Sequence, residues 1–335
     1  MNAPTCRLEP KDYASDQEVR WCPGCGDYAI LRAVQKALSN LGADPARTVF
    51  VSGIGCAARF PYYVRTYGFH GIHGRAPAIA TGIKLANPAL DVWVIGGDGD
   101  MLSIGGNHLI HALRRNVDLQ ILLFNNEIYG LTKGQCSPTT RLGTRTSSTP
   151  AGSIDGPLSA CRLALGAGAR FVARAVDTQQ KLLPEILERA KLHRGAALVE
   201  ILQNCIVYND GAFDDVAGKE VEAEAQIRLA HGEPLVFGKA KDKGLRLRVD
   251  GLGLEIVPIG ADGPDAAGVL RHDQTDPVLA QMLAALEPPM PVAVGILYDD
   301  PAPSYEMRRA QQAPAGRRTD LGALLRQAPT WVVPG

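Results

Sequence analysis

The stretch DVWVIGGDGDMLSIGGNHLIHALRRNVDLQILLFNN, residues 91–126, decides the fold. Its first apolar run ends at Gly97-Asp98-Gly99, a helical pattern follows, and a second apolar run ends at Asn125-Asn126. A strand, a helix and a strand at this spacing are typical of a βαβ unit, whose two strands are parallel. We therefore predict an α/β fold with a parallel sheet and helices on both faces.

Polar residues stand where both strands of this unit end. The carboxyl ends of parallel strands open onto the same edge of a sheet, where ligands of such folds bind. Asp98 and Asn126 are thus expected to converge on one cation. Carboxylate, amide and phosphate oxygens suit Mg²⁺, and the following helix N-terminus suits an anion, so the pattern predicts a divalent metal with a diphosphate.

The glycines of this stretch taken alone are also consistent with a tight turn between strand and helix. The paired asparagines at the next strand end disfavour that interpretation. A dinucleotide motif starting at Gly97 fails because Leu102 stands where its third glycine belongs. The sequence also has no GxxxxGK[ST] phosphate loop.

The pattern extends outward in both directions. Further predicted strands and helices are a helix opened by an Asp27 N-cap, a strand at 48–52, a helix at 76–86, and strand, helix and strand in FVARAV, QKLLPEILERAKLH and AALVEILQNC. Residues 127–157 are rich in Gly, Ser, Thr and Pro, and such long loops are usually functional. A solvated helix is expected at 217–230.

The character of the chain changes near residue 231. LRLRVDGLGLEIV alternates on both sides of Asp250-Gly251, which indicates a β-hairpin. We therefore predict two parts, a main domain at 1–230 and a small mixed C-terminal extension at 231–335.

Four of the seven cysteines form a second constellation. Cys22 and Cys25 belong to WCPGCG, and Cys56 and Cys205 each follow a predicted strand. If those strands are parallel to the metal-site strands, all four sulfurs reach the same edge, and four thiolates are what a [4Fe–4S] cluster requires. A Cys₄ zinc site is the alternative. We expect Cys6 to be inert, Cys161 to lie in the core, and Cys136 to lie near a cofactor without binding the cluster.

Composition excludes several classes of protein. The formal net charge of +0 gives no reason to expect a nucleic acid or an anionic membrane as partner. The polar N-terminus lacks the apolar segment of a signal peptide, and no apolar run approaches the roughly 18 residues of a membrane span. An odd number of cysteines without a secretion signal favours metal or cluster ligands over disulfides, and a cytoplasmic location.

The motifs together resemble the β subunit of 2-oxoacid:ferredoxin oxidoreductases. The resemblance covers about residues 20–210 and is carried by WCPGCGD, SGIGC, HGRAPAIATGIKLANP, GGDGDMLSIGGNHLIHALRRN, FNNEIYGLTKGQCSPTT and Cys205. HGRA and IGGNH look most like the branch that acts on 2-oxoglutarate. One departure is Asn204, where several relatives have proline before the last cysteine.

The resemblance implies thiamine diphosphate, Mg²⁺ and one [4Fe–4S] cluster as cofactors. In the thiamine-diphosphate signature the metal is bound by Asp98, Asn126 and the backbone carbonyl of Ile128. Gly99 and Asp100 lie against the diphosphate, and the loop 129–132 closes over it. The expected cofactor-binding residues are Gly55, His73, Gly97, Gly99, Asp100, Asn126, Gly130, Leu131 and Thr132, and the expected cluster ligands are Cys22, Cys25, Cys56 and Cys205.

The implied reaction is the CoA-dependent oxidative decarboxylation of 2-oxoglutarate to succinyl-CoA and CO₂ with reduction of ferredoxin, reversible in principle. An α subunit is expected to supply the carboxylate that activates thiamine and much of the CoA site, in an α2β2 assembly. The alternatives are the same reaction on pyruvate or on a broad range of 2-oxoacids, a non-redox thiamine carboligase, and a zinc-stapled interaction subunit without catalysis.

Arg59 and His73 are the candidate substrate residues. A basic residue three positions after the third cysteine recurs in family members that accept 2-oxoglutarate, and a guanidinium would pair the distal carboxylate of that substrate. The alternative is that Arg59 lies at the surface or pairs with the α subunit. Arg75 and Lys84 are weaker candidates for the same role. His73 precedes a predicted helix N-terminus and is expected to contact diphosphate or substrate; Asn107 and His108 are further candidates for the pocket wall.

Overall fold

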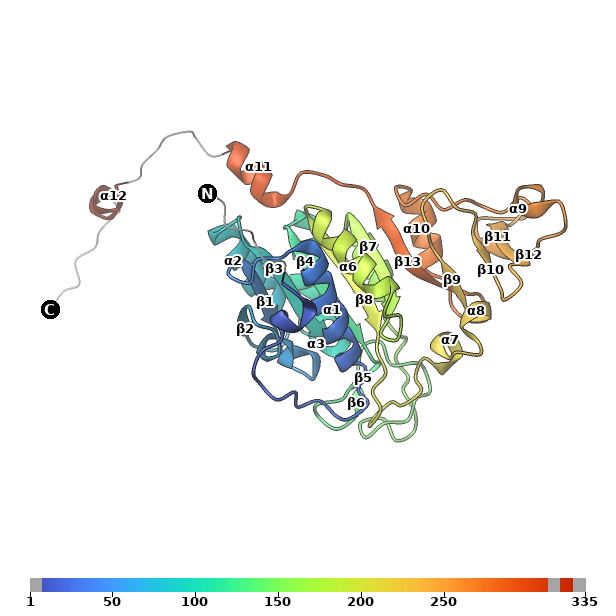
Figure 1. Cartoon of the computed structure of the whole chain (residues 1–335), viewed down its shortest axis with the longest axis horizontal. Helices are drawn as coiled ribbons and strands as arrows, with labels where there is room; N and C mark the ends of the chain where they lie inside the picture. Colours follow the sequence, from blue (N-terminus) through green and yellow to red (C-terminus); the bar gives the residue numbers. More distant parts are fainter. Residues whose placement is uncertain (1–7, 313–319, 328–335) are drawn as a thin grey trace.

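The computed structural model describes residues 8–312 and 320–327. Its centre is an eight-stranded sheet with the order β2-β1-β3-β4-β8-β7-β13-β9 (Figure 1). The strands are β1 (Thr48–Ser52), β2 (Tyr67–His70), β3 (Asp91–Gly97), β4 (Leu119–Asn125), β7 (Phe171–Val176), β8 (Ala196–Leu202), β9 (Gln226–Arg228) and β13 (Val292–Asp299).

The predicted parallel sheet is confirmed over the middle of the chain. Strands β1, β3, β4, β8 and β7 run parallel, and β3 pairs with β4 in the register Trp93↔Gln120 to Gly97↔Phe124. Strands buried on both faces read as continuous apolar runs, as VWVI and ILLF do. The register brings Gly97 level with Phe124, so the GDG turn and the paired asparagines leave the sheet at the same edge.

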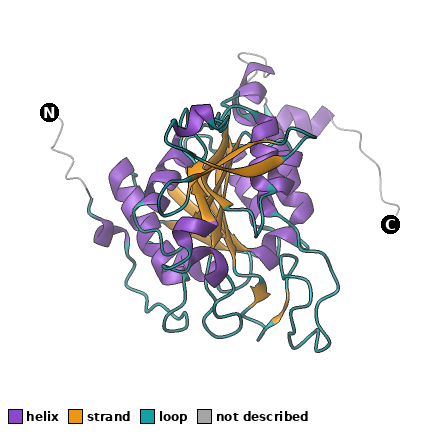
Figure 2. Ribbon diagram, turned by 90° about the vertical axis from the view of Figure 1, so that its right-hand side faces the viewer, coloured by secondary structure: helices purple, strands orange, loops and turns teal. Residues whose placement is uncertain are grey.

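Helices cover both faces of the sheet, as predicted (Figure 2). On one face, Trp93 and Ile95 pack with α1 (Asp27–Leu41) and α6 (Leu182–Leu192). On the other face, Val92 and Val94 pack in a second cluster with α2 (Ala76–Ala86), α4 (Gly106–Arg115), α5 (Ala160–Gly166) and α10 (Pro277–Ala284). Alternate side chains of one strand thus belong to two cores, which is the period of a β-strand.

The remaining elements are short. They are η1 (Pro10–Tyr13), η2 (Ala57–Tyr62), α3 (Asp98–Leu102), β5 (Ile128–Tyr129), β6 (Gln135–Cys136), α7 (Asp214–Ala217), α8 (Glu222–Ala225), β10 (Val236–Phe237), β11 (Lys243–Leu247), β12 (Leu254–Pro258), α9 (Gly263–Ala266), α11 (Tyr305–Gln312) and α12 (Leu321–Gln327). Between 127 and 157 only β5 and β6 are regular, so the predicted long loop is confirmed. No helix among the described residues is long and apolar enough to cross a bilayer.

The structure joins part of the predicted C-terminal extension to the main sheet. The hairpin is confirmed, because β11 and β12 are antiparallel and Leu247 pairs with Leu254 around the Asp250-Gly251 centre. However, β13 returns to the central sheet antiparallel to β7. This strand is apolar and almost wholly buried, and its side chains pack in the core of the main sheet, while the domain boundary at residue 230 stays a prediction.

Two local predictions were wrong, and one strand was missed. The helix expected at 217–230 is replaced by α7, α8 and β9, because Gly218 ends α7 and Gln226 and Ile227 are buried in the sheet. The edge strand β2 was missed, since all four of its side chains are exposed and leave no apolar pattern. Asp27 is the first residue of α1, whose N-cap is Gly26.

Candidate functional site

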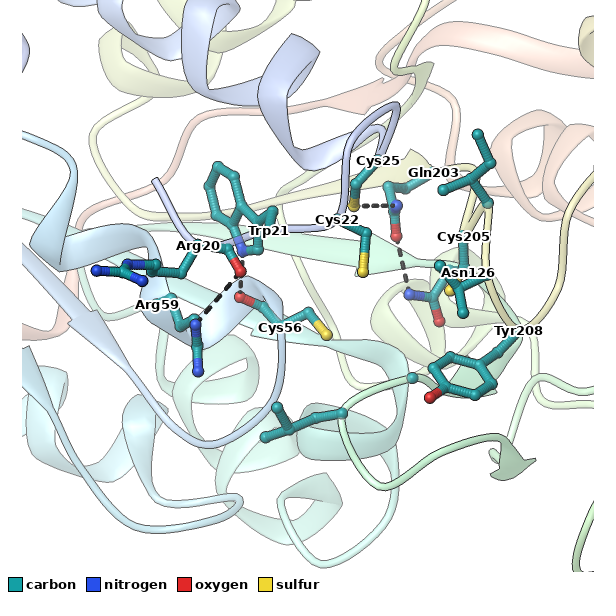
Figure 3. Close-up of a pocket in the computed structure, with 14 residues that line it drawn as sticks. Arg20, Trp21, Cys22, Cys25, Cys56, Arg59, Asn126, Gln203, Cys205 and Tyr208 are labelled. Atoms are coloured by element: carbon teal, nitrogen blue, oxygen red, sulfur yellow. Dashed lines mark hydrogen bonds between the residues drawn. The ribbon is translucent and has the colours of Figure 1, made fainter. Parts of the chain in front are cut away.

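Two adjoining pockets open at the carboxyl edge of the parallel strands. The first, here called the glycine pocket, is lined by all the residues predicted to bind the cofactor or its metal: Gly55, His73, Gly97, Asp98, Gly99, Asp100, Asn126, Ile128, Gly130, Leu131 and Thr132. The second, here called the cysteine pocket, is lined by Cys22, Cys25, Cys56 and Cys205 (Figure 3). The structure therefore brings together, in two neighbouring groups, side chains that are far apart in the sequence.

Gly130 forms the wall between the two pockets. A β-carbon at this position would lie 3.4 Å from Cys205 Sγ and 3.7 Å from Cys56 Sγ, while the residue also lines the glycine pocket. Gly99, in the GDG turn, has no room for a side chain, since a β-carbon there would lie 2.3 Å from a ring atom of Tyr129. The phenol of Tyr129 donates a hydrogen bond to the Gly99 carbonyl at 2.9 Å. The loop after β4 is thereby tied onto the GDG turn.

Asp98 is the buried carboxylate at the floor of the glycine pocket. Its exposed fraction is 2%, and Thr139 Oγ1 donates a hydrogen bond to Asp98 Oδ2 at 2.6 Å. Burial raises the pKa of Asp98, because the charged form loses its water, and hydrogen bonds from Ser137 and Thr139 oppose that shift only in part. A cation next to this group would restore the favourable charged state.

A buried polar network holds Thr139 from behind. Thr139 Oγ1 lies 2.9 Å from Asn125 Oδ1, and the Asn125 amide donates to Glu200 Oε1 at 2.9 Å. Arg174 Nε donates to Glu200 Oε2 at 2.8 Å, and both of these charged residues are buried. The two asparagines that end β4 therefore have different surroundings: Asn125 joins the network, whereas Asn126 faces the pockets.

Asn126 is held in one orientation by three neighbours. Its side-chain Nδ2 donates to Gln203 Oε1 at 2.8 Å, and its Oδ1 accepts from the backbone N–H of Ile128 at 3.2 Å. Asn209 Nδ2 donates to the Asn126 carbonyl at 2.9 Å. The amide is thus fixed where it lines both pockets.

Asp100 and His73 shape the wall of the glycine pocket. Asp100 Oδ1 accepts from the backbone N–H groups of Gly74, at 2.7 Å, and Ile54, at 3.1 Å, and lies 2.8 Å from His73 Nδ1. The carboxylate is almost fully buried; its Oδ1 joins three separate turns, whereas its Oδ2 has no hydrogen-bond partner among the described residues. His73 is the more accessible member, with 37% of its side chain exposed.

The four cysteines differ in their surroundings. Cys22 is exposed, whereas Cys25, Cys56 and Cys205 are half-buried. Burial raises the pKa of the Cys56 thiol to about 12 and raises that of Cys25 further, and the charges of neighbouring cysteines and of Asp27 add to both shifts. Without a metal the Cys25 and Cys56 thiols are neutral at pH 7, and metal binding must displace their protons.

Cys136 and Cys161 lie outside the cysteine pocket. Cys161 is buried in α5 as predicted, and its Sγ donates to Glu200 Oε2 at 3.1 Å. Cys136 lies beside the hydroxyls of Thr146 and Thr149, at 3.4 and 3.0 Å. Cys6 lies outside the described residues.

The basic candidates for substrate binding are dispersed. Arg59 lies in η2 and lines the cysteine pocket, where its Nη1 is 3.4 Å from the Arg20 carbonyl and its guanidinium lies apart from the sulfur atoms (Figure 3). Arg75 is exposed and pairs with His108. Lys84 is wrong as a candidate, because its buried ammonium forms an ion pair with Asp118 at 2.8 Å. Asn107, on the same helix as His108, is exposed.

Asp27 and Gln203 are site residues that the sequence did not reveal. Asp27 is 1% exposed, lines the glycine pocket, and has no hydrogen-bond partner for either carboxyl oxygen within the described part of the chain; burial raises its pKa to about 7. Gln203 is also 1% exposed and lines both pockets. The signal in the sequence was position only: Asp27 follows the CxxCG motif, and Gln203 follows a strand two residues before Cys205.

Comparisons with known proteins agree with this geometry. Residues 53–201 match the family model "Thiamine pyrophosphate enzyme, C-terminal TPP binding domain". The chain is 52% identical to 2-oxoglutarate oxidoreductase subunit KorB of Mycobacterium tuberculosis, over 96% of this chain and 88% of that protein. It is 42% identical to 2-oxoglutarate synthase subunit KorB of Methanocaldococcus jannaschii, over 66% of this chain and 80% of that protein.

A solved structure extends the comparison to the whole chain. It is the 2-oxoglutarate:ferredoxin oxidoreductase from Magnetococcus marinus with 2-oxoglutarate, coenzyme A and succinyl-CoA bound, and it matches with a TM-score of 0.76 and 33% identity, over 96% of this chain and 97% of that one. The family model, the match to KorB over nearly the full length and the two pockets at one sheet edge agree with one another. The chain therefore belongs to the family of 2-oxoacid:ferredoxin oxidoreductase β subunits, in its 2-oxoglutarate branch.

Proposed function

We propose that this chain is the β subunit of an enzyme that converts 2-oxoglutarate and CoA to succinyl-CoA and CO₂ while reducing ferredoxin, reversibly in principle. The observation that carries the proposal is the shared wall of the two pockets. Gly130 separates a pocket suited to thiamine diphosphate from a pocket lined by four cysteines. Decarboxylation and electron removal therefore have adjacent sites in one chain. The ligands named for the solved relative support the choice of substrate.

The glycine pocket fits thiamine diphosphate only together with a cation. Within the described part of the chain, no lysine or arginine lines this pocket, whereas the carboxylates of Asp27, Asp98 and Asp100 do. A diphosphate would be repelled there unless a metal ion lay between, and Mg²⁺ takes oxygen ligands. We assign Asp98, the Asn126 side chain and the Ile128 carbonyl as ligands of Mg²⁺, with Gly55, Gly97, Gly99 and the 129–132 loop around the diphosphate.

The cysteine pocket fits one [4Fe–4S] cluster better than one zinc ion. A zinc ion requires its ligand sulfurs about 2.3 Å from a single point. Among the described residues, no three His, Cys, Asp or Glu side chains are grouped as ligands of one metal ion. The four cysteines instead surround a common pocket, as the thiolates of a larger cluster do.

Each part of the site has a defined task. When bound, thiamine diphosphate supplies the electron sink that lets a 2-oxoacid lose CO₂. Asp98 carries the charge that holds the metal, and Tyr129 keeps the closing loop on the GDG turn. Arg59 pairs the distal carboxylate of 2-oxoglutarate, and His73 lies against the diphosphate or the substrate.

The proposed partners complete the enzyme. An α subunit supplies the carboxylate that activates thiamine and much of the CoA site, in an α2β2 assembly, and a ferredoxin accepts the electrons. A cytoplasmic location suits thiols that must stay reduced for cluster assembly. A broad range of 2-oxoacids is a second candidate for the substrate, because an Aeropyrum pernix relative, 51% identical over 57% of this chain and 60% of that protein, is named only for 2-oxoacids.

The test is anaerobic co-purification with the α subunit, followed by an assay across several 2-oxoacids. We expect CoA- and ferredoxin-dependent activity, greatest with 2-oxoglutarate, from a brown protein. A comparable rate with pyruvate would support the broad range instead. A colourless protein with stoichiometric zinc would refute the redox proposal and favour the carboligase or the interaction subunit.

A further inference from the structure

Gln203 lies between the two pockets and contacts a predicted ligand of each. Its side-chain oxygen Oε1 accepts from Asn126 Nδ2 at 2.8 Å, and its Nε2 lies 3.4 Å from Cys25 Sγ (Figure 3). The residue is almost fully buried and lines both pockets. The proposed metal site and the proposed cluster are thus joined through a single side chain.

The orientation of this amide is determined by its neighbours. Gln203 Nε2 also donates to the Asn204 carbonyl at 2.5 Å, so both of its protons have acceptors, one on a carbonyl and one on a sulfur. The reversed amide would place its oxygen against that carbonyl and against a thiolate, while its NH₂ would face the Asn126 NH₂. The bonds therefore run in one direction, from Asn126 through Gln203 to the Cys25 sulfur.

The backbone around Gln203 is held as firmly as its side chain. The Gln203 N–H donates to the Asn125 carbonyl at 2.8 Å, and the Gly26 N–H donates to the Asn204 carbonyl at 3.1 Å. The Asn204 N–H donates to Asp177 Oδ2 at 3.0 Å. These contacts attach the residue to the end of β4 and to the CxxC turn, so the two side-chain bonds are parts of a rigid connection.

We infer that Gln203 is a positioning residue for both cofactors: it fixes the metal-binding orientation of Asn126 and donates a hydrogen bond to the cluster ligand Cys25. The inference rests on the proposed function for the identity of the two groups. By holding Asn126 Nδ2, Gln203 leaves the carbonyl oxygen of that amide as the only atom available to a cation. Such outer contacts are typically worth about 10–100-fold in metal affinity.

The bond to sulfur has a separate consequence. Reduction adds negative charge to a cluster and its thiolates, and a donor to sulfur stabilises the reduced form. Loss of that donor is therefore expected to make the midpoint potential more negative. A tenfold change in the ratio of reduced to oxidised cluster corresponds to about 59 mV for one electron. Gln203 thus contributes to the potential at which the enzyme can reduce its acceptor.

Two variants separate the two tasks. Gln203→Glu keeps the oxygen that accepts from Asn126 but loses the donor to Cys25, whereas Gln203→Met loses both at similar size. The matched control is Gln180→Met, because Gln180 Nε2 donates only to backbone carbonyls, of Ala29 at 3.3 Å and Asp177 at 2.7 Å, among the described residues.

The αβ complex of each variant is purified anaerobically. The cluster potential is measured by an EPR-monitored titration, and thiamine diphosphate affinity is measured by calorimetry at several Mg²⁺ concentrations.

We expect Gln203→Met to bind thiamine diphosphate with Mg²⁺ about 10–100-fold more weakly and to shift the potential to more negative values. Gln203→Glu is expected to shift the potential in the same direction while its Mg²⁺-dependent affinity stays within about threefold of wild type, since it retains the acceptor for Asn126. Gln180→Met is expected to change neither quantity.

Three results would overturn the inference. One is that neither the thiamine diphosphate affinity nor the cluster potential changes in Gln203→Met. The second is an equal loss of cofactor affinity in both Gln203 variants, which would indicate a general packing defect. The third is an unchanged potential in Gln203→Glu. If a variant assembles no cluster, calorimetry still decides, since the Glu variant must bind the cofactor more tightly than the Met variant does. A wild-type protein without iron would instead contradict the proposed function.

Discussion

The glycine pocket and the cysteine pocket share one wall but are built differently. The glycine pocket lies on the ends of adjacent parallel strands, and its central carboxylate is held by Thr139 and by the buried network behind it. The cysteine pocket is built from turns: a CxxC turn, the turn after β1 and the segment after β8, with Cys22 exposed to solvent. The proposed diphosphate site thus depends on adjacent strand ends and one supporting loop residue, whereas the proposed cluster site depends on three separate turns.

The largest expected effect is loss of thiamine diphosphate binding by Asp98→Ala. Without this carboxylate, Mg²⁺ loses the main charge at its site and the diphosphate meets uncompensated negative groups. Calorimetry with Mg²⁺ and thiamine diphosphate is expected to show no binding, while the iron content stays at the wild-type value. Asp155→Ala, in the exposed part of the long loop, is the control and is expected to bind normally. Unchanged cofactor content in Asp98→Ala would refute the metal assignment.

The reverse experiment removes the cluster. Serine at Cys22, Cys25, Cys56 or Cys205 is expected to lower the iron content or alter the cluster spectrum, because a cluster of this type needs four thiolates. Thiamine diphosphate affinity is expected to change much less, since Asp98 and Asn126 keep their hydrogen bonds to Thr139 and Gln203. Cys161→Ser is the control, as its sulfur is buried in the core. Full iron in Cys205→Ser together with loss of iron in Cys136→Ser would show that the fourth ligand is misassigned.

A smaller effect is expected from the support behind Asp98. Thr139→Val keeps the shape of the side chain but removes the hydroxyl that donates to Asp98 Oδ2, and we expect Mg²⁺-dependent cofactor affinity to fall by about 10–100-fold. Thr139→Ser should restore most of it. Thr48 is equally buried and donates to the Asp44 carbonyl at 2.9 Å, so Thr48→Val is a matched control for lost packing. If both valine variants weaken binding equally, the position of Asp98 does not depend on Thr139.

The smallest of these effects concerns substrate choice. Arg59→Ala is expected to raise the KM for 2-oxoglutarate by about tenfold, corresponding to about 1.4 kcal/mol for a lost charge-assisted bond. Activity with a 2-oxoacid that has a small uncharged tail should fall much less, because that substrate has no carboxylate to pair. Arg248→Ala, at an exposed residue next to the C-terminal hairpin turn, serves as the control. Equal proportional losses with both substrates would show that Arg59 does not select the substrate.

The contrast between a pocket built on strand ends and a pocket built from turns also explains which parts of the molecule were predictable from the sequence. Long apolar runs such as VWVI and ILLF are buried on both faces, so they indicate central strands, and polar residues after them indicate the edge where ligands bind. Strand β2 escaped prediction because it has no buried face. Strand β9 escaped because it is three residues long and its acidic neighbours have helical propensity.

The missed site residues depend on contacts between distant parts of the chain. Gln203 meets Cys25 across 178 positions, and Thr139 meets Asp98 across 41. The sequence around Gln203 does not distinguish it from a surface glutamine, and the sequence around Thr139 does not distinguish it from the neighbouring Thr140. The cysteines were predictable because their chemistry restricts them to few roles, whereas polar residues that support a site are recognised only when their partners are known.

The central claim, electron transfer from the glycine pocket to the cysteine pocket, is tested most directly by an anaerobic single-turnover experiment on the αβ complex without an external electron acceptor. After 2-oxoglutarate and CoA are mixed with enzyme loaded with thiamine diphosphate and Mg²⁺, the EPR spectrum is recorded. We predict about four irons per β chain, as one [4Fe–4S] cluster requires, and a reduced-cluster signal that appears only with substrate and is absent in Asp98→Ala. Stoichiometric zinc without iron, or a cluster whose spectrum does not respond to 2-oxoglutarate and CoA, would contradict the proposed electron transfer from the glycine pocket to the cysteine pocket.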